Sequence, residues 1–180
     1  MEHFDLAIIG AGPGGYVAAI HAAKSGLKVA LVEKDKVGGA CYNVGCIPSK
    51  IMLEHSKLVQ EIRRGTEWGI TVPTIEVDFP KLMKRKDRVI EQLLLNIESF
   101  IASAQIKMYR GVGHVQADKI VTVNEESFGA TNIILATGSH PFVPESSFQE
   151  YFPHEEPISQ RHHYRLSPNG FSLSFVLTDL

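Results

Sequence analysis

Short apolar runs near the N-terminus predict two buried strands. The first extends from Phe4 to Ile9 and ends at a glycine, and the second extends from Leu27 to Glu33. Uninterrupted apolar runs are typical of parallel strands whose two faces are both covered. Between them, the alanine-rich stretch from Tyr16 to Lys24 predicts a helix that Gly26 ends. Strand, helix and strand fit within about 30 residues, the size of a βαβ unit.

The middle of the chain favours longer helices, and short strands follow. The helices are predicted from about Pro48 to Arg64 and from about Pro80 to Ala104, where apolar residues recur at helical spacing. A basic run in the second helix is expected to be a solvated face, and it comprises Lys81, Lys84, Arg85, Lys86 and Arg88. Turn residues then separate four β-like runs, which are Ile106 to Arg110, Val112 to Gln116, Ile120 to Val123 and Asn132 to Ala136. The last run is predicted to be a buried central strand.

These elements predict an α/β fold with a central parallel sheet, long helices and a small antiparallel β insertion. The pattern changes after about His140, because the last 40 residues hold five of the nine Pro and five of the nine Phe. They show no sustained periodicity before Phe171 to Leu177. We therefore expect one domain over residues 1–147 and a divergent or irregular tail over residues 148–180.

Composition excludes several classes of function. The 180 residues are 44% apolar and 21% charged with a net charge of -2, which favours neither nucleic acid nor an anionic membrane as a partner. No apolar run is long enough to span a bilayer. The N-terminus enters its first apolar run without a basic segment, so we expect no signal peptide. A chain with two cysteines and no leader is expected to be cytoplasmic, where a reactive pair is more common than a structural disulfide.

A glycine-rich turn follows the first strand. Gly10, Gly12 and Gly15 form the pattern G-x-G-x-x-G, which permits a tight turn, a close approach of backbone to a pyrophosphate and close packing of helix on strand. Glu33 ends the second strand, about 20 residues later, where an acid accepts a hydrogen bond from a ribose. A glycine-rich turn without a ligand is the alternative, which this context disfavours. A second small turn, at Thr137 and Gly138, follows the later predicted strand.

Cys41 and Cys46 admit three uses. A zinc site is disfavoured, because structural zinc needs four ligands and no second cysteine pair exists. Residues five apart in an ideal helix have Cα atoms roughly 8–9 Å apart, beyond the roughly 7 Å limit for a disulfide. A bridge therefore requires an irregular segment, with Cys46 near the start of the helix proper and a stabilised thiolate there. Two buried free thiols are the third possibility.

The stretch GGACYNVGCIPSK, residues 38–50, resembles the redox motif G-G-x-C-x-N-x-G-C-x-P-[ST]-K of the flavin-dependent pyridine nucleotide–disulfide oxidoreductases. This motif is long and specific, and its place after the glycine turn also agrees. The similarity extends from about Phe4 to Pro141. Within the family, Ile47 and Ser49 resemble the dihydrolipoyl dehydrogenases most, while mercuric and glutathione reductases are sister groups.

The resemblance implies a Rossmann-like FAD-binding domain and a role for each matched residue. The pyrophosphate of FAD would be held by Gly10, Gly12, Gly14 and Gly15. Glu33 would bind the adenosine ribose beside Lys34, the adenine would lie near Gly113 and His114, and the cofactor would be closed over by Ala136, Thr137 and Gly138. Gly39 and Lys50 would lie toward the flavin. Cys41, the more exposed thiol, would exchange with the substrate, and Cys46 would face the flavin as a charge-transfer thiolate.

The resemblance also implies a substrate and partners. A dihydrolipoamide-type dithiol would reduce the Cys41–Cys46 disulfide, FAD would take the electrons, and NAD would receive them. Full-length family members are homodimers, some within 2-oxo acid dehydrogenase complexes. No glycine fingerprint occurs after Gly138, so we expect a C-terminally truncated chain without the nicotinamide and interface domains and incomplete for turnover. An inactive FAD-binding remnant and a sister reductase are the alternatives.

Overall fold

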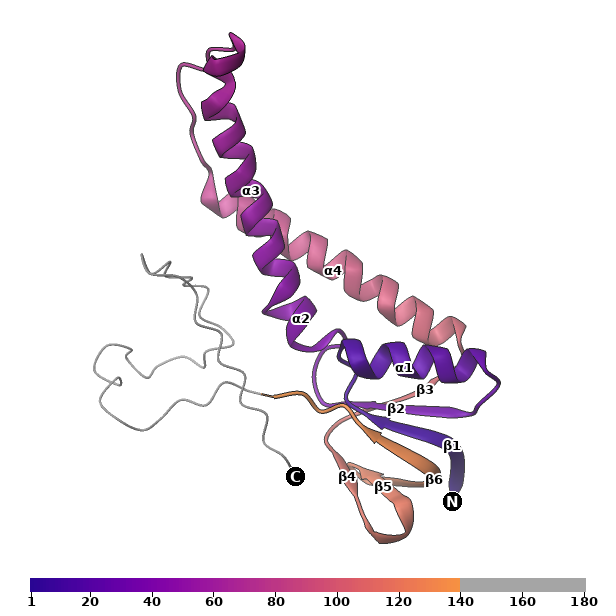
Figure 1. Ribbon diagram of the computed structural model, residues 1–180. Helices are drawn as coiled ribbons and strands as arrows, with labels where there is room; N and C mark the ends of the chain where they lie inside the picture. Colours follow the sequence, from indigo (N-terminus) through magenta and orange to yellow (C-terminus); the bar gives the residue numbers. More distant parts are fainter. Residues whose placement is uncertain (140–180) are drawn as a thin grey trace, which may run out of the picture. The chain divides into compact units, whose positions relative to one another are not determined.

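The computed structural model describes residues 1–139, in which one six-stranded sheet organises the fold (Figure 1). Its spatial order is β3-β2-β1-β6-β5-β4. The strands are β1 (Glu2–Ile9), β2 (Val29–Glu33), β3 (Lys107–Arg110), β4 (Gly113–Val115), β5 (Ile120–Val123) and β6 (Glu126–Leu135). Strands β3, β2, β1 and β6 are mutually parallel, and β6, β5 and β4 continue antiparallel. The predicted α/β class with its antiparallel insertion is confirmed.

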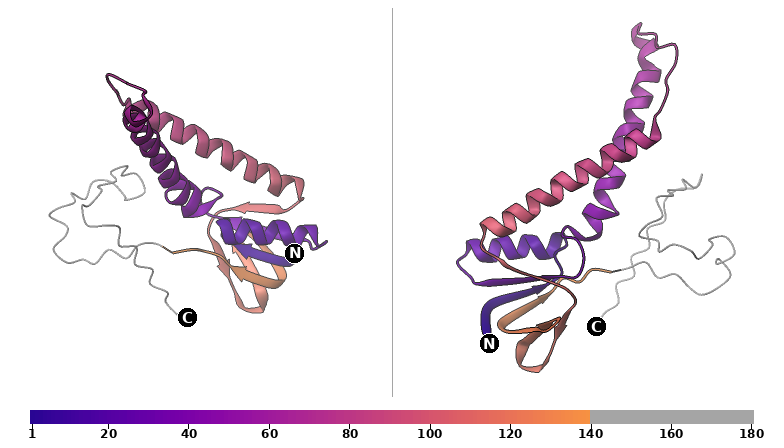
Figure 2. Two further views of the ribbon diagram at one scale, coloured as in Figure 1. Left: turned by 45° about the horizontal axis from the view of Figure 1, so that its top comes forward. Right: turned by 180° about the vertical axis from the view of Figure 1, so that it is seen from behind.

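The helices lie close to the predicted ranges. They are α1 (Pro13–Lys24), α2 (Gly39–Asn43), α3 (Cys46–Arg64) and α4 (Phe79–Ser103), with 3-10 turns η1 (Gly65–Trp68) and η2 (Ala117–Lys119). Asp78 caps α4, because its Oδ1 accepts the N–H of Lys81 at 2.9 Å. Helices α3 and α4 form a hairpin that extends away from the sheet, as both views of Figure 2 show.

Apolar residues cover both faces of the sheet. On one face, α1 and the C-terminal half of α4 bury a cluster that includes Leu6, Ile8, Leu31, Ile97 and Ile101. On the other, the antiparallel arm folds back over Phe4, whose ring lies edge-on to Phe128 with centroids 5.2 Å apart. Burial on both faces explains why β1 and β2 are apolar runs rather than alternating ones.

Two predictions about burial are wrong. The strand that ends at Ala136 is central in the sheet, but Ile134 and Leu135 are 40% and 64% exposed, because no element within residues 1–139 packs on its C-terminal end. The predicted solvated face is wrong only at Lys86, which is 4% exposed and pairs through its Nζ with Asp87 at 2.8 Å. The other members of the basic run are exposed as predicted, and they are Lys81, Lys84, Arg85 and Arg88. Lys86 lies on the same face of α4 as the buried Leu82 and Ile90, four residues to either side, so its place on the helix rather than its charge decided its burial.

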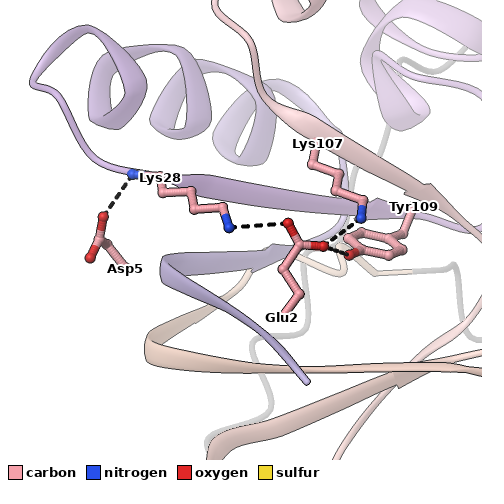
Figure 3. Close-up of polar contacts among 5 residues, drawn as sticks. All are labelled: Glu2, Asp5, Lys28, Lys107 and Tyr109. Carbon is pink, nitrogen blue, oxygen red and sulfur yellow. Dashed lines mark hydrogen bonds and ion pairs between the residues drawn. The ribbon is translucent and has the colours of Figure 1, made fainter.

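A network of charges closes the N-terminal end of the sheet, opposite the strands' carboxyl ends (Figure 3). The carboxylate of Glu2 pairs with the ammonium groups of Lys28, at 3.1 Å, and Lys107, and it accepts a hydrogen bond from the Tyr109 hydroxyl at 3.4 Å. The hydrogen bonds from Lys107 and Lys28 lower the pKa of Glu2 to about 2. This network joins β1, β2 and β3 far from the glycine turn.

Candidate functional site

Strand order places the candidate site at the carboxyl end of β1. From β1 the sheet continues through β2 and β3 on one side and through β6 on the other, so the order reverses between β1 and β6. Open α/β sheets bind ligands in the crevice at such a reversal. Gly10 directly follows β1, and Ala136 directly follows β6 and donates its N–H to the Ile9 carbonyl at 2.8 Å. The two turns predicted to hold a ligand therefore lie side by side.

Two positions of this turn admit only glycine. Gly10 has φ +104°, and a Cβ there would lie 2.2 Å from the carbonyl oxygen of Ala136. A Cβ on Gly15 would lie 1.8 Å from the carbonyl oxygen of Gly10. At Gly14, by contrast, nothing lies within 4 Å of the added carbon. The first and third glycines of the pattern are thus required by packing, while Gly14 borders open space.

Helix α1 begins inside the turn and directs its N-terminus at that space. Gly12 is the N-cap residue and Pro13 opens the helix. The N–H groups of a first helical turn have no partner within the helix, and the helix dipole adds partial positive charge there. Gly14 and Gly15 therefore present donors suited to an anion such as phosphate.

Glu33 is buried and holds the turn. Its Oε2 accepts the N–H of Ala11 at 2.7 Å, and its Oε1 accepts the N–H of Asp35 at 2.9 Å. The Ala11 carbonyl in turn accepts the N–H of Gly38 at 2.8 Å. One carboxylate thus joins the glycine turn to the end of β2 and to the loop that leads to the cysteines. A carboxylate has about four acceptor positions, so a ribose hydroxyl would share it with two backbone groups.

The cysteine segment is irregular, as a bridge would require. Cys41 lies in the five-residue helix α2, Cys46 is the first residue of α3, and the chain breaks helical geometry between them at Val44 and Gly45. The side-chain amide of Asn43 donates to the carbonyls of Val37 and Gly39 at 3.0 and 2.8 Å, which fixes α2 against the preceding loop. The prediction that Cys46 begins the helix proper is confirmed.

Both cysteines are free thiols in this structure, and they are in contact. A hydrogen bond with the Cys46 side chain, followed by partial burial, raises the pKa of Cys41, while the Cys46 backbone N–H and the charge of Lys50 oppose that shift. The predicted order of exposure is wrong: Cys46 is exposed and Cys41 is only partly so. The Cys41 sulfur lies at the Cys46 backbone N–H, at the start of α3, whereas the Cys46 side chain is exposed.

The structure brings some of the other predicted residues together. Gly39 lies on the turn, because a Cβ there would be 2.9 Å from the Cα of Gly12. Gly113 lies over the ends of β1 and β2, where its Cβ would be 3.1 Å from Val32. A Cβ on Gly10 would lie 3.2 Å from the Thr137 Cα, which places the turn after β6 against the glycine turn. The remaining candidates are all exposed, and they are Lys34, Lys50, His114, Thr137 and Gly138.

Sequence reasoning missed two residues that shape the site, Ala11 and Tyr16. Ala11 is fully buried and bonds to both Glu33 and Gly38. Tyr16 of α1 shares a hydroxyl contact with Tyr42 of α2, 26 residues away. No spacing rule connects residues so far apart, although the place of Tyr16 directly after Gly15 could have drawn attention to it.

Within residues 1–139, no group of three or more His, Cys, Asp or Glu side chains is arranged to hold a metal ion. No helix in that range is long and apolar enough to cross a membrane.

Comparison with a sequence model of a known family supports the geometry. The family described as pyridine nucleotide-disulphide oxidoreductase matches residues 4–166. The match includes the glycine turn, Glu33, both cysteines and the turn after β6, and it continues beyond the described residues.

Several curated relatives carry the name dihydrolipoyl dehydrogenase. The protein of Acholeplasma laidlawii is 41% identical over 144 residues, which cover 79% of this chain and 43% of the relative. The protein of Chlamydia trachomatis serovar D is 44% identical over 143 residues, covering 78% and 31%, and that of Thermus scotoductus is 38% identical over 141 residues, covering 78% and 30%. The chain therefore spans less than half the length of these relatives.

Proposed function

This chain belongs to the pyridine nucleotide-disulphide oxidoreductase family, and we propose that it binds FAD at the glycine turn and exchanges electrons through Cys41 and Cys46. One observation carries the proposal: the turn and the dithiol segment are packed directly on each other. Gly38 donates its N–H to Ala11 of the turn at 2.8 Å, and Gly39 lies against Gly12. A cofactor held by the turn would therefore extend toward the dithiol.

The described residues fit such a cofactor. The open space beside Gly14 and the N-terminus of α1 suit a pyrophosphate. The buried carboxylate of Glu33, with two backbone donors already bound, has acceptor positions left for a ribose hydroxyl. We propose Lys34, Gly113 and His114 toward the adenine end, and Ala136, Thr137 and Gly138 as the cover. When bound, FAD supplies a two-electron acceptor that the side chains lack.

The chemistry of the chain itself is thiol–disulfide exchange. In the oxidised protein, a substrate thiolate attacks one sulfur of the Cys41–Cys46 bond, and the second substrate thiol then closes a substrate disulfide. The substrate loses two electrons and two protons, and both protein sulfurs become thiols or thiolates. The Cys46 N–H and the ammonium of Lys50 lie where they favour a negative charge on the Cys41 sulfur.

The substrate and partners form the finer part of the proposal. We propose a dihydrolipoamide-type dithiol as the reductant, NAD as the final acceptor, and a homodimer associated with a 2-oxo acid dehydrogenase complex in the cytoplasm. The relatives named dihydrolipoyl dehydrogenase support the substrate. The described residues contain the proposed cofactor turn and both cysteines, so the dithiol-to-FAD half of the reaction is the part that they can test.

The test is a titration of the purified 180-residue chain with FAD, followed by flavin fluorescence and absorbance. We expect a saturable spectral change at one FAD per chain and bleaching of the bound flavin by anaerobic dihydrolipoamide. A folded chain that leaves the FAD spectrum unchanged would contradict the proposal. Bleaching by reduced glutathione but not by dihydrolipoamide would instead indicate a sister reductase.

A further inference from the structure

Two tyrosine hydroxyls join the glycine-turn helix to the cysteine segment. The Tyr16 Oη and the Tyr42 Oη are 3.2 Å apart, a hydrogen bond in which either atom can donate. The rings pack edge to face, with centroids 6.3 Å apart at 78°. Tyr16 directly follows Gly15 in α1, and Tyr42 directly follows Cys41 in α2. The contact therefore links the residue next to the turn with the residue next to a reactive sulfur.

The tyrosine of α2 is packed at its base. A Cβ added to Gly38 would lie 2.8 Å from the Tyr42 Cβ and 2.9 Å from the Leu94 Cδ2, and both side chains pack against the same core cluster. Its backbone N–H also donates to the Gly38 carbonyl at 3.3 Å. A ring confined at its base is oriented by whatever binds its hydroxyl, which here is Tyr16.

Helix α2 depends on such contacts for its position. It has five residues, and a helix that short is not stable by itself. The Asn43 side chain ties it to the Val37 carbonyl in the preceding loop. The Tyr16–Tyr42 hydrogen bond ties α2 to α1. The Asn43 bond and the tyrosine bond therefore restrain α2, which carries Cys41, on two sides.

We propose that the Tyr16–Tyr42 hydrogen bond is a positioning device that holds Cys41 against Cys46 for disulfide closure and couples this geometry to the helix opened by the glycine turn. The inference rests on the proposed redox role of the cysteines. It assigns a purpose to a tyrosine beside the reactive thiol, where the motif of the family leaves the residue type open.

The Tyr16 hydroxyl keeps its proton at neutral pH. Burial, with the Tyr42 hydrogen bond, raises the pKa of Tyr16 to about 12. The charged or titratable groups that act on Cys41 are Cys46 and Lys50, and the charge of Cys41 in turn acts on Tyr16. The bond therefore persists over the pH range in which disulfide exchange proceeds, and its effect is positional.

The test measures the equilibrium between the Cys41–Cys46 dithiol and its disulfide in glutathione redox buffers, without FAD, by trapping free thiols. In that reaction glutathione disulfide takes two electrons and two protons from the dithiol. Tyr16→Phe and Tyr42→Phe each keep the ring and remove the bond. Since a neutral hydrogen bond has a modest net value, we expect each to lower the disulfide equilibrium constant about two- to tenfold.

Two comparisons make the result decisive. The double variant Tyr16→Phe/Tyr42→Phe should lose no more than either single variant, because each removes the same bond. Tyr109→Phe is the matched control: it also deletes a tyrosine hydroxyl bond, at 3.4 Å to Glu2, but at the other end of the sheet, and it should leave the equilibrium unchanged.

An unchanged equilibrium constant in a folded single variant would overturn the inference, even if thermal stability falls. Additive losses in the double variant would overturn it as well. Either single variant breaks the bond, so one that folds is sufficient. Because the assay contains no FAD, failure of the chain to bind flavin would contradict the proposed function without altering this result.

Discussion

Replacing Glu33 by Gln tests whether this carboxylate holds the glycine turn or serves only a ligand. Glu33 is 8% exposed, and its two oxygens accept the N–H groups of Ala11 and Asp35 at 2.7 and 2.9 Å. Gln has a single acceptor oxygen, and its amide nitrogen cannot face a backbone N–H. Ala11 is fully buried, whereas Asp35 is exposed. The remaining oxygen should therefore stay with Ala11, and the Asp35 N–H should turn to water.

The magnitude follows from these two bonds. A hydrogen bond to a charged group has a net value of about 1.5–3 kcal/mol, and a neutral one about 0.5–1.5 kcal/mol. Glu33→Gln weakens the bond to Ala11 and loses the bond to Asp35, whose N–H regains water. We expect the free energy of unfolding to fall by about 1–3 kcal/mol. Glu33→Ala should cost about 1–3 kcal/mol more, because it leaves the buried Ala11 N–H without a partner.

The assay is urea unfolding of the FAD-free protein at neutral pH, followed by circular dichroism. Glu98→Gln is the matched control, since Glu98 pairs with Arg110 at 2.6 Å on the surface, and it should change stability by no more than about 1 kcal/mol. A parallel FAD titration should show at least tenfold weaker binding for Glu33→Gln. Wild-type stability of FAD-free Glu33→Gln, with FAD binding weakened, would refute the reasoning, because a ribose contact alone leaves the FAD-free protein unchanged.

Three further predictions concern the turn, the N-terminal charges and the thiols. Gly15→Ala should abolish FAD binding and destabilise the fold, while Gly14→Ala should leave the FAD-free protein equally or more stable in the same unfolding assay. The pKa of Glu2 is lowered in the folded protein from 4.5 to about 2, so its contribution is present above pH 4.5 and is lost as pH falls toward 2. Urea midpoints between pH 5 and pH 2 should therefore fall more steeply for wild type than for Glu2→Gln, and parallel curves would contradict this. Cys41→Ser and Cys46→Ser should each prevent flavin reduction by dihydrolipoamide with FAD affinity within about twofold of wild type; loss of FAD binding in both would contradict the assigned roles.

The fold was predictable where the pattern is local. The apolar runs of β1 and β2 predicted parallel strands because both faces of each strand are covered, and the three predicted helix ranges were correct within a few residues. The five-residue helix α2 was not predicted. The same rule failed at Ile134 and Leu135, where an apolar run ends a central strand that nothing in residues 1–139 covers. The predicted boundary at residue 147 lies outside the described residues. An apolar run predicts that its side chains will be buried, but it does not identify the helix, strand or partner that packs on them.

In the candidate site, too, the features set by local geometry were predictable and those set by packing were not. The glycines were predictable because a tight turn with a following helix imposes local constraints that only glycine meets, as the 1.8 Å approach at Gly15 shows. The exposure of Cys41 and Cys46 was not predictable, since it depends on how α2 is oriented relative to α3. The partners of Glu33 were also missed, because a carboxylate in a sequence does not reveal whether a ligand or the backbone occupies it.

By itself, the sequence determined the order of the elements, the dinucleotide turn and the spacing of the two thiols, because these follow from backbone restrictions and side-chain periods over a few residues. Tertiary structure alone decided which residues hold that chemistry in place. It buried Lys86, gave Glu33 two backbone donors and brought Tyr16 to Tyr42 across 26 residues. Contacts between distant residues depend on how whole elements pack, and no local pattern encodes their geometry.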